Sequence, residues 1–176
     1  MRHQFGRREY IPLHESILWR IETGVVRTLT WDQEQVQTTL GLWGAGDLVG
    51  EPISVIAPYR MQCLTEVEVS VLPTSLWHSL IDNLLVHSQQ AENLLRILHY
   101  TPNQVRLYHF LVWLGQRFGD RIPQGYLIDW KITHQEIAEL VGLSRVSVTR
   151  LLNQFRREGM IDWSSDRFLI IAAQDT

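Results

Sequence analysis

Two arginines, Arg145 and Arg150, lie on a short segment whose apolar residues repeat with the period of an α-helix. The apolar positions, which predict a buried underside, are Val148, Leu151, Leu152 and Phe155. The two arginines fall on the opposite, free face of this predicted helix, residues 144–157. A guanidinium can donate two hydrogen bonds to the edge of a guanine or clamp a phosphate. The pattern therefore predicts a helix that reads the major groove of DNA.

Several other side chains share the free face or lie beside it. Val146 and Thr149 offer methyl groups that can pack on a thymine methyl. Arg156 and Arg157 come later and suit backbone phosphates, whereas for His134 a phosphate contact and simple exposure are equally good interpretations. The side chains predicted to contact DNA are Thr133, His134, Ser144, Arg145, Val146, Ser147, Thr149, Arg150, Asn153, Arg156 and Arg167.

The preceding residues are those that a helix-turn-helix needs. Thr133 followed by Glu136 is a capping-box pattern, which predicts the start of a first helix. Ala138 permits a close helix crossing, and Gly142 suits the left-handed residue at which that helix must end. Ser144 is a suitable N-cap for the second helix. An ordinary helical hairpin with a solvated charged face is the alternative interpretation.

A β-hairpin is predicted after the second helix, which Gly159 ends. Its strands are residues 161–163 and 168–171, joined by a polar turn that contains Arg167. This hairpin would form a wing beside the reading helix. For Arg167, a phosphate contact and a solvated turn are equally good interpretations.

Length and composition limit the remaining possibilities. A chain of 176 residues with 45% hydrophobic residues can form one large or two small domains with a real core. The net charge of −3 is unevenly distributed, because the acidic excess lies in the first half and the C-terminal part is mildly basic. We expect a cytoplasmic protein with no membrane segment, because no apolar run is long enough and the N-terminus is not a signal peptide. The single cysteine, Cys63, excludes a disulfide within the chain and a four-cysteine metal site, and we expect no metal.

The rest of the chain divides into a β-rich part and a helical part. Residues 17–72 contain short alternating segments separated by turns, which predicts a sandwich or small barrel. Residues 74–100 turn helical, and an apolar seam along residues 84–99, which includes Leu94 and Leu95, packs on the barrel or on a second copy. Thr101 and Pro102 then predict the cap of another helix over 103–118. We therefore predict two domains, residues 1–101 and 102–176.

In this order, the elements and motifs resemble the CRP/FNR family of transcriptional regulators. The similar segments are residues 21–27, 46–51 and, most specifically, 132–145, and the resemblance covers nearly the whole chain. Residues 118–133 and 145–150 look most like the cyanobacterial NtcA branch. The resemblance implies an α+β fold: a double-stranded β-helix (a jelly roll like that of cyclic-nucleotide-binding domains), a connecting helix and a C-terminal winged helix-turn-helix.

The resemblance also implies a function and partners. It implies a homodimer that reads a palindrome in double-stranded DNA, of a GTA…TAC type, with Arg145, Val146 and Arg150 as base readers. It allows RNA polymerase as a further partner. The family's cyclic-nucleotide sites keep an Arg-Ser pair to hold the phosphate, whereas Ala57 and Pro58 fall near that place here. We therefore do not expect cAMP to bind, and the sequence does not show which other small-molecule effector, if any, does.

Two other function classes remain as alternatives. A protein-interaction module with a degenerate helix-turn-helix would show no sequence-selective DNA binding. A cupin-type barrel enzyme would need a cluster of His and carboxylate ligands on the barrel strands. None of the seven histidines falls within residues 17–72, so we do not expect an enzyme.

Overall fold

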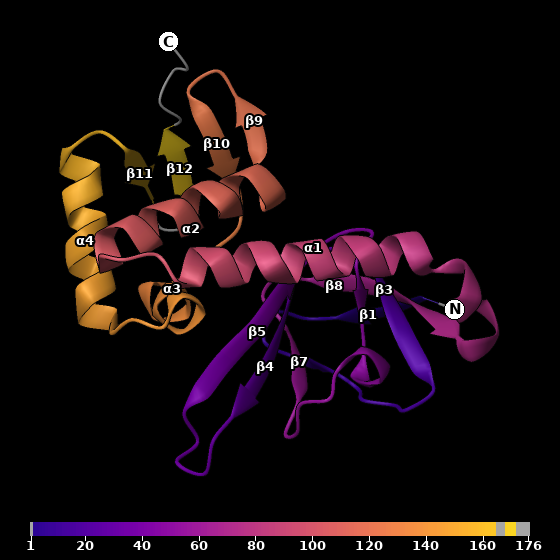
Figure 1. Ribbon diagram of the computed structural model, residues 1–176. Helices are drawn as coiled ribbons and strands as arrows, with labels where there is room; N and C mark the ends of the chain where they lie inside the picture. The colour runs from indigo at the N-terminus through magenta and orange to yellow at the C-terminus, as the bar shows by residue number, and fades with distance from the viewer. Residues whose placement is uncertain (1, 165–167, 172–176) are drawn as a thin grey trace. The chain divides into compact units, whose positions relative to one another are not determined.

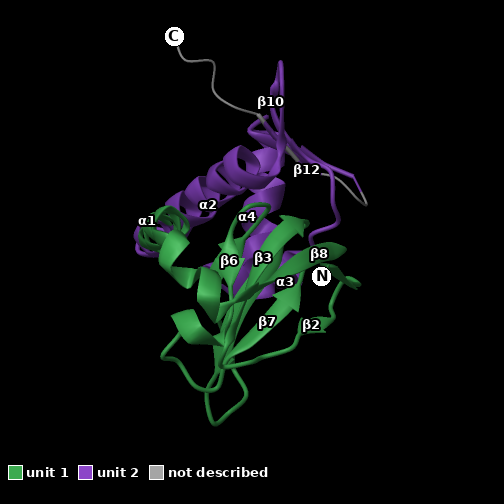
Figure 2. Ribbon diagram, turned by 90° about the vertical axis from the view of Figure 1, so that its right-hand side faces the viewer, with its two compact units in different colours: residues 1–93 green, residues 94–176 purple. Residues whose placement is uncertain are grey.

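The protein forms two compact units, residues 1–93 and 94–176 (Figure 2). The structure is a computed structural model that describes residues 2–164 and 168–171 (Figure 1). The boundary between the units falls within helix α1 (Ile81–Leu98), earlier in the chain than the boundary predicted at 101/102. No helix among the described residues is long and apolar enough to cross a membrane.

The first unit is a β-roll made of two four-stranded sheets. One sheet has the order β1-β8-β3-β6 and the other β2-β7-β4-β5, and all pairings are antiparallel. The strands are β1 (Arg2–Phe5), β2 (Tyr10–Ile11), β3 (Ile17–Thr23), β4 (Val26–Trp31), β5 (Gln37–Trp43), β6 (Leu48–Val49), β7 (Arg60–Cys63) and β8 (Val67–Pro73). The prediction of β structure over 17–72 is confirmed, and β1 and β2 add N-terminal strands that the sequence pattern did not predict.

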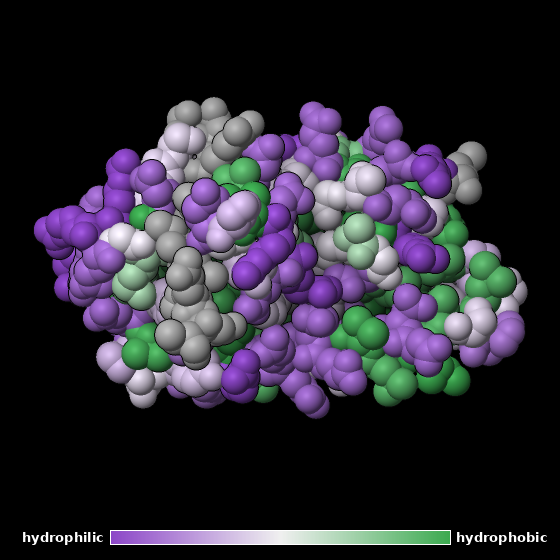
Figure 3. Space-filling model, turned by 90° about the horizontal axis from the view of Figure 1, so that it is seen from above, coloured by the Kyte–Doolittle hydropathy of each residue, from purple (hydrophilic) through white to green (hydrophobic). Residues whose placement is uncertain are grey.

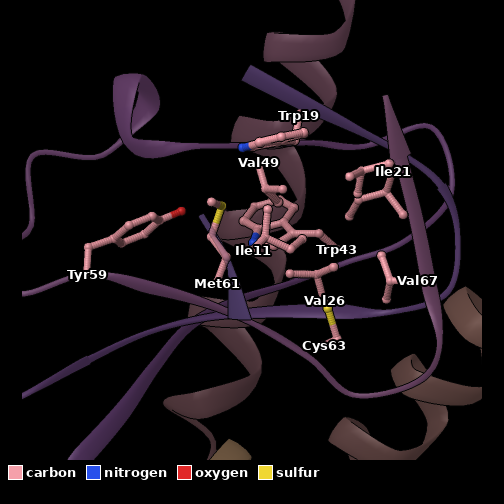
Figure 4. Close-up of a cluster of buried hydrophobic side chains, with 11 residues drawn as sticks. Ile11, Trp19, Ile21, Val26, Trp43, Val49, Tyr59, Met61, Cys63 and Val67 are labelled. Atoms are coloured by element: carbon pink, nitrogen blue, oxygen red, sulfur yellow. The ribbon is translucent and has the colours of Figure 1, made fainter. Parts of the chain in front are cut away.

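Side chains from both sheets meet in one hydrophobic core (Figure 4). Trp43 lies in this core, and its indole N–H donates to the Thr28 hydroxyl at 3.0 Å, so its polar atom is not left unpaired. Cys63 is fully buried in the same core. Burial, reinforced by the charge of Glu9, raises the pKa of the Cys63 thiol to about 12, so the reactive thiolate is suppressed.

Helical structure follows the roll, as predicted for residues 74–100. A 3-10 helix, η2 (Thr74–Ser79), leads into α1, and α2 (Asn103–Phe118) has the bounds predicted for it. The predicted cap at Thr101 is wrong. Pro102 occupies the N-cap position and no side chain caps this helix, because α2 begins one residue too late for the Thr101 hydroxyl to reach its first turn.

The apolar seam predicted along α1 is divided between two faces of the helix. Ala91 packs against the roll core and Leu94 is buried, whereas Leu95 is 57% exposed. Two apolar rows on neighbouring faces look like one seam in the sequence, because they differ by only about 100° around the helix axis. Apolar side chains also reach the surface as separate patches among hydrophilic ones on the face drawn in Figure 3.

The second unit combines helices with a third four-stranded sheet of order β11-β12-β10-β9. Its further elements are β9 (Asp120–Ile122), β10 (Gly125–Ile128), α3 (His134–Val141), α4 (Arg145–Arg157), β11 (Ile161–Trp163) and β12 (Phe168–Ile171). The predicted hairpin is confirmed as β11 and β12, but the sequence pattern did not predict β9 and β10. Helix α2 approaches β10 closely at Gly115, where a Cβ atom would lie 2.8 Å from the Cβ of Tyr126. A larger residue at Gly115 would therefore push the helix away from the sheet.

Candidate nucleic-acid interface

Helix α3 begins with the capping box predicted from the sequence. The Glu136 backbone N–H donates to the Thr133 hydroxyl at 3.1 Å, and the Thr133 backbone N–H donates to the Glu136 carboxylate at 2.7 Å. The Thr133 hydroxyl itself donates to the same carboxylate at 2.9 Å. Thr133 therefore has a structural role as the N-cap of α3, and its contact with DNA stays a prediction.

The turn between the two helices is built at Gly142. This residue has φ 66° and ψ 40°, the left-handed conformation predicted for it, and its backbone N–H bonds to the Ala138 carbonyl. Ala138 is buried, as a close crossing of α3 and α4 requires. The tight turn and the small side chain together fix the angle at which α4 leaves α3.

Helix α4 is anchored at its start and along its underside. The Ser144 hydroxyl accepts the Ser147 backbone N–H at 3.1 Å and donates to the Ser147 hydroxyl at 2.9 Å. The predicted underside is confirmed, since all its members are buried: Val148, Leu151, Leu152 and Phe155. The aromatic ring of Tyr108 on α2 meets Phe155 edge-on, with 5.9 Å between the ring centroids.

The opposite face of α4 is open and positively charged. Arg145, Arg150 and Asn153 are exposed, and the aliphatic Val146 is 78% exposed. At about 100° per residue, these four positions lie within one stripe along the helix. Two guanidinium groups, one amide and one aliphatic group therefore face the same direction.

Arg156 belongs to the same helix but is already engaged. Its guanidinium bonds to the Asp162 carboxylate at 2.9 Å and lies over the Trp163 ring, 4.8 Å from the ring centroid. These contacts join the end of α4 to β11 of the wing. The predicted phosphate contact of Arg156 is untested, and this ion pair would compete with it.

His134 lies at the start of α3, beside α4 and the wing. Its Nδ1 is 3.0 Å from the Thr149 hydroxyl oxygen, and its ring meets Trp163 edge-on at 5.8 Å between centroids. Burial, together with the positive charge of Arg145, lowers the pKa of His134 below its usual value. His134 is thus a half-buried, neutral side chain near pH 7 rather than a simply exposed one.

A hollow opens between the start of α3 and the wing. It is lined by cationic, hydroxyl-bearing, aromatic and aliphatic side chains: Lys131, Ile132, Thr133, His134, Trp163, Ser164 and Phe168. The backbone N–H groups at the first turn of a helix favour an anion, and Lys131 adds a positive charge. The predicted contact at Arg167 lies outside the described residues.

The roll contains a second hollow, within the first unit. Its described lining is Thr28, Leu40, Trp43, Ile53, Ser54, Val55, Ile56, Tyr59, His87 and Ala91. The His87 ring on α1 stacks on Trp43, with 3.8 Å between centroids. Among the described residues, Nδ1 of His87 has no hydrogen-bond partner, and no three potential metal ligands come together.

The lowered pKa values of the two half-buried histidines, His87 and His134, predict how the free energy of unfolding depends on pH. Burial lowers the pKa of His87, outweighing a backbone bond at Leu48 and the charge of Asp47, which raise it, and burial also lowers that of His134. Between the lowered values and the ordinary value of 6.5, the unfolded chain binds protons that the folded chain does not. We therefore expect the contribution of these two groups to the free energy of unfolding to be fully present above pH 6.5. It should decrease as the pH falls below that value.

Urea denaturation at a series of pH values between about 8 and 5 would measure this slope, as a change in the free energy of unfolding. His87→Phe keeps a ring on Trp43 but does not titrate, so its slope should be smaller. An unchanged slope in that variant would exclude His87 as a contributor.

Comparisons with known proteins agree with this geometry. Residues 105–174 match the model of the Crp-like helix-turn-helix domain. The chain is 40% identical to the regulatory protein CysR of Synechococcus elongatus over 174 residues, which cover 97% of this chain and 84% of that protein. It is also 42% identical over 72 residues to the global nitrogen regulator of the same species, covering 41% of this chain and 32% of that protein.

Among solved structures, a CRP-family transcriptional regulator of Thermus thermophilus superposes with a TM-score of 0.82 at 25% identity. The superposition covers 97% of this chain and 92% of that one. The similarity therefore extends over the roll and the helix-turn-helix together.

Proposed function

The chain is a DNA-binding transcriptional regulator that belongs to the CRP/FNR family, and we propose that it reads a palindromic operator as a homodimer. In this proposal, α4 of each protomer enters the major groove of one half-site. The observation that carries the proposal is the pairing of a fully buried underside of α4 with an open face bearing Arg145 and Arg150. We place this regulator in the cytoplasm, where it would meet DNA and RNA polymerase.

A second copy of the chain is the partner that best fits the exposed face of α1. Ile81, Leu85 and Leu95 are 63%, 56% and 57% exposed, and Leu84 lies beside them. These residues lie within about 100° around the helix, on the side opposite the buried Ile97. Pairing this face with its twin would remove apolar surface from water. Binding to a palindrome would then require the two α4 helices to lie about 34 Å apart, the spacing of successive major grooves.

Selection from a library of random palindromes, followed by mobility-shift titration, tests the proposal. We expect one palindromic sequence family to be enriched, with affinity that falls as salt rises. Equal binding to every sequence, or no binding at any salt, would instead favour a protein-interaction module. Transcription in vitro from a template that carries the selected operator would test RNA polymerase as a partner.

The roll is proposed not to hold a cyclic nucleotide. No described residue that lines its hollow carries a guanidinium or an ammonium group. Arg60, the nearest arginine in sequence to the loop 53–59, lies with its guanidinium carbon 4.3 Å from the centroid of the Trp31 ring and 5.3 Å from that of Tyr10. A phosphate in the hollow would therefore be buried without a paired cation, which is strongly unfavourable.

Calorimetric titration with cAMP and with cGMP, and operator binding with and without each nucleotide, would check this expectation. We expect no saturable heat and no change in affinity for the operator. Saturable binding of either nucleotide would contradict it.

A further inference from the structure

Thr149 differs from the other groups on the open face of α4, because its hydroxyl is held by a residue of α3. Its Oγ1 lies 3.0 Å from Nδ1 of His134, and Thr149 is half-buried, whereas Arg145, Val146 and Arg150 are exposed or nearly so. Whichever atom carries the shared proton, the bond keeps the hydroxyl directed toward α3. The χ1 angle of Thr149 is therefore fixed by a contact from outside its own helix.

A fixed χ1 decides which part of Thr149 is available to a base. The Cβ atom carries a hydroxyl, a methyl and a hydrogen, and the hydroxyl is occupied by His134. A threonine in a helix otherwise divides its population between two rotamers. With the hydroxyl engaged by His134, the methyl group is the part of the side chain that remains for a base, and its natural partner in the major groove is the 5-methyl of thymine.

His134 can hold Thr149 only because it is itself fixed. Its ring meets the Trp163 ring edge-on, and Trp163 lies under the Arg156 guanidinium, which is bonded to Asp162. Three elements, α3, α4 and β11, thus meet around one imidazole. The charged groups near it are Arg145 on α4 and Lys131, which lines the same hollow.

We propose that His134 is a positioning residue that sets the preference for thymine at the operator position facing Thr149. The inference rests on the proposed function, since it concerns the same DNA-reading face. It assigns His134 a role in specificity, which differs from both interpretations that the sequence left open, a phosphate contact and simple exposure.

Uracil provides a direct probe of this role, because it differs from thymine only by the missing 5-methyl group. Each thymine of the selected operator would be replaced by uracil, one at a time, and affinities measured by fluorescence anisotropy. At the position that responds to Thr149→Ala, the unchanged protein should lose about fourfold in affinity, the value of one buried methyl-sized group. Thr149→Ala should abolish that difference.

His134→Ala should reduce the thymine-to-uracil ratio at this position to about one, since Thr149 is then free to change rotamer. His134→Asn places an amide atom near the position of Nδ1 and should restore most of the ratio. In a Thr149→Ala background, His134→Ala should change the ratio no further. Gln154→Ala is the matched control, because it removes a polar side chain from α4 that bonds to Glu158.

The outcomes separate this inference from the function on which it rests. A protein that selects no sequence would overturn both. A selective protein whose thymine-to-uracil ratio is unchanged by His134→Ala would overturn only the role of His134. Equal weakening of all sequences by His134→Ala, with the ratio intact, would also overturn it and indicate a phosphate contact or a purely structural role.

Discussion

Alanine at Arg145 or at Arg150 is expected to weaken binding to the selected operator by roughly 5- to 150-fold each, or about 1–3 kcal/mol. Both side chains are exposed on a helix that is anchored by its buried underside, so the helix itself needs no rearrangement when they meet a base edge. Loss of a guanidinium should also relax the preference at the base that it contacts. Affinities for the operator, and for versions with each half-site base changed in turn, would measure both effects.

Arg157 provides the matched comparison on the same helix. It is exposed at the last turn of α4, where a phosphate contact is expected instead of base reading. Arg157→Ala should weaken all sequences by a similar factor and lower the slope of log affinity against log salt by about one. If the variants at Arg145 and Arg150 bound every sequence as selectively as the parent protein does, the base-reading role would be wrong.

The helix-turn-helix was predictable because its signals are local. A capping box such as that of Thr133 and Glu136 needs residues only three positions apart, and a left-handed turn needs one glycine at the right place. The buried underside of α4 follows from helical periodicity alone. Each of these features depends on neighbours within one or two turns, so the chain carries the information without its tertiary structure.

The contacts that join the elements were not predictable in the same way. His134 and Thr149 meet because α3 and α4 cross at one angle, and Arg156 reaches Asp162 only once the wing has packed beside α4. The strands β9 and β10 are three and four residues long, too short to establish an alternating pattern. The sequence therefore predicted which side chains lie on the open face of α4, but not which of them are held by contacts with neighbouring elements.

The helix α1 shows the same limit on a larger scale. Leu94 and Leu95 are adjacent in sequence, yet one is 3% exposed and the other 57%. Hydrophobicity alone assigns both to one seam, and only packing against the rest of the fold separates them. This separation leaves Ile81, Leu85 and Leu95 as an exposed apolar face.

Charged residues on that face are expected to separate the proposed dimer and to have the largest effect on operator binding. In the double variant Leu85→Glu and Leu95→Glu, like charges would face each other across the twofold axis. A monomer binds only one half-site at a time, so affinity for the palindrome should fall by about 10²- to 10⁴-fold, the usual contribution of a linked second site. Affinity for an isolated half-site should stay unchanged, because α4 is not altered.

Val86→Glu is the control. It shows whether the effect needs a charge within the exposed apolar stripe or arises from any charge placed on α1. Val86 is also exposed on α1, at 42%, but it lies about 100° around the axis from Leu85 and outside the stripe. This variant should remain dimeric and keep its affinity for the palindrome. Sedimentation equilibrium would give the mass of each variant, and thermal unfolding would show that the charges leave the fold intact, as expected for exposed positions. A double variant that is still dimeric and still binds the palindrome tightly would show that the two copies meet through another surface.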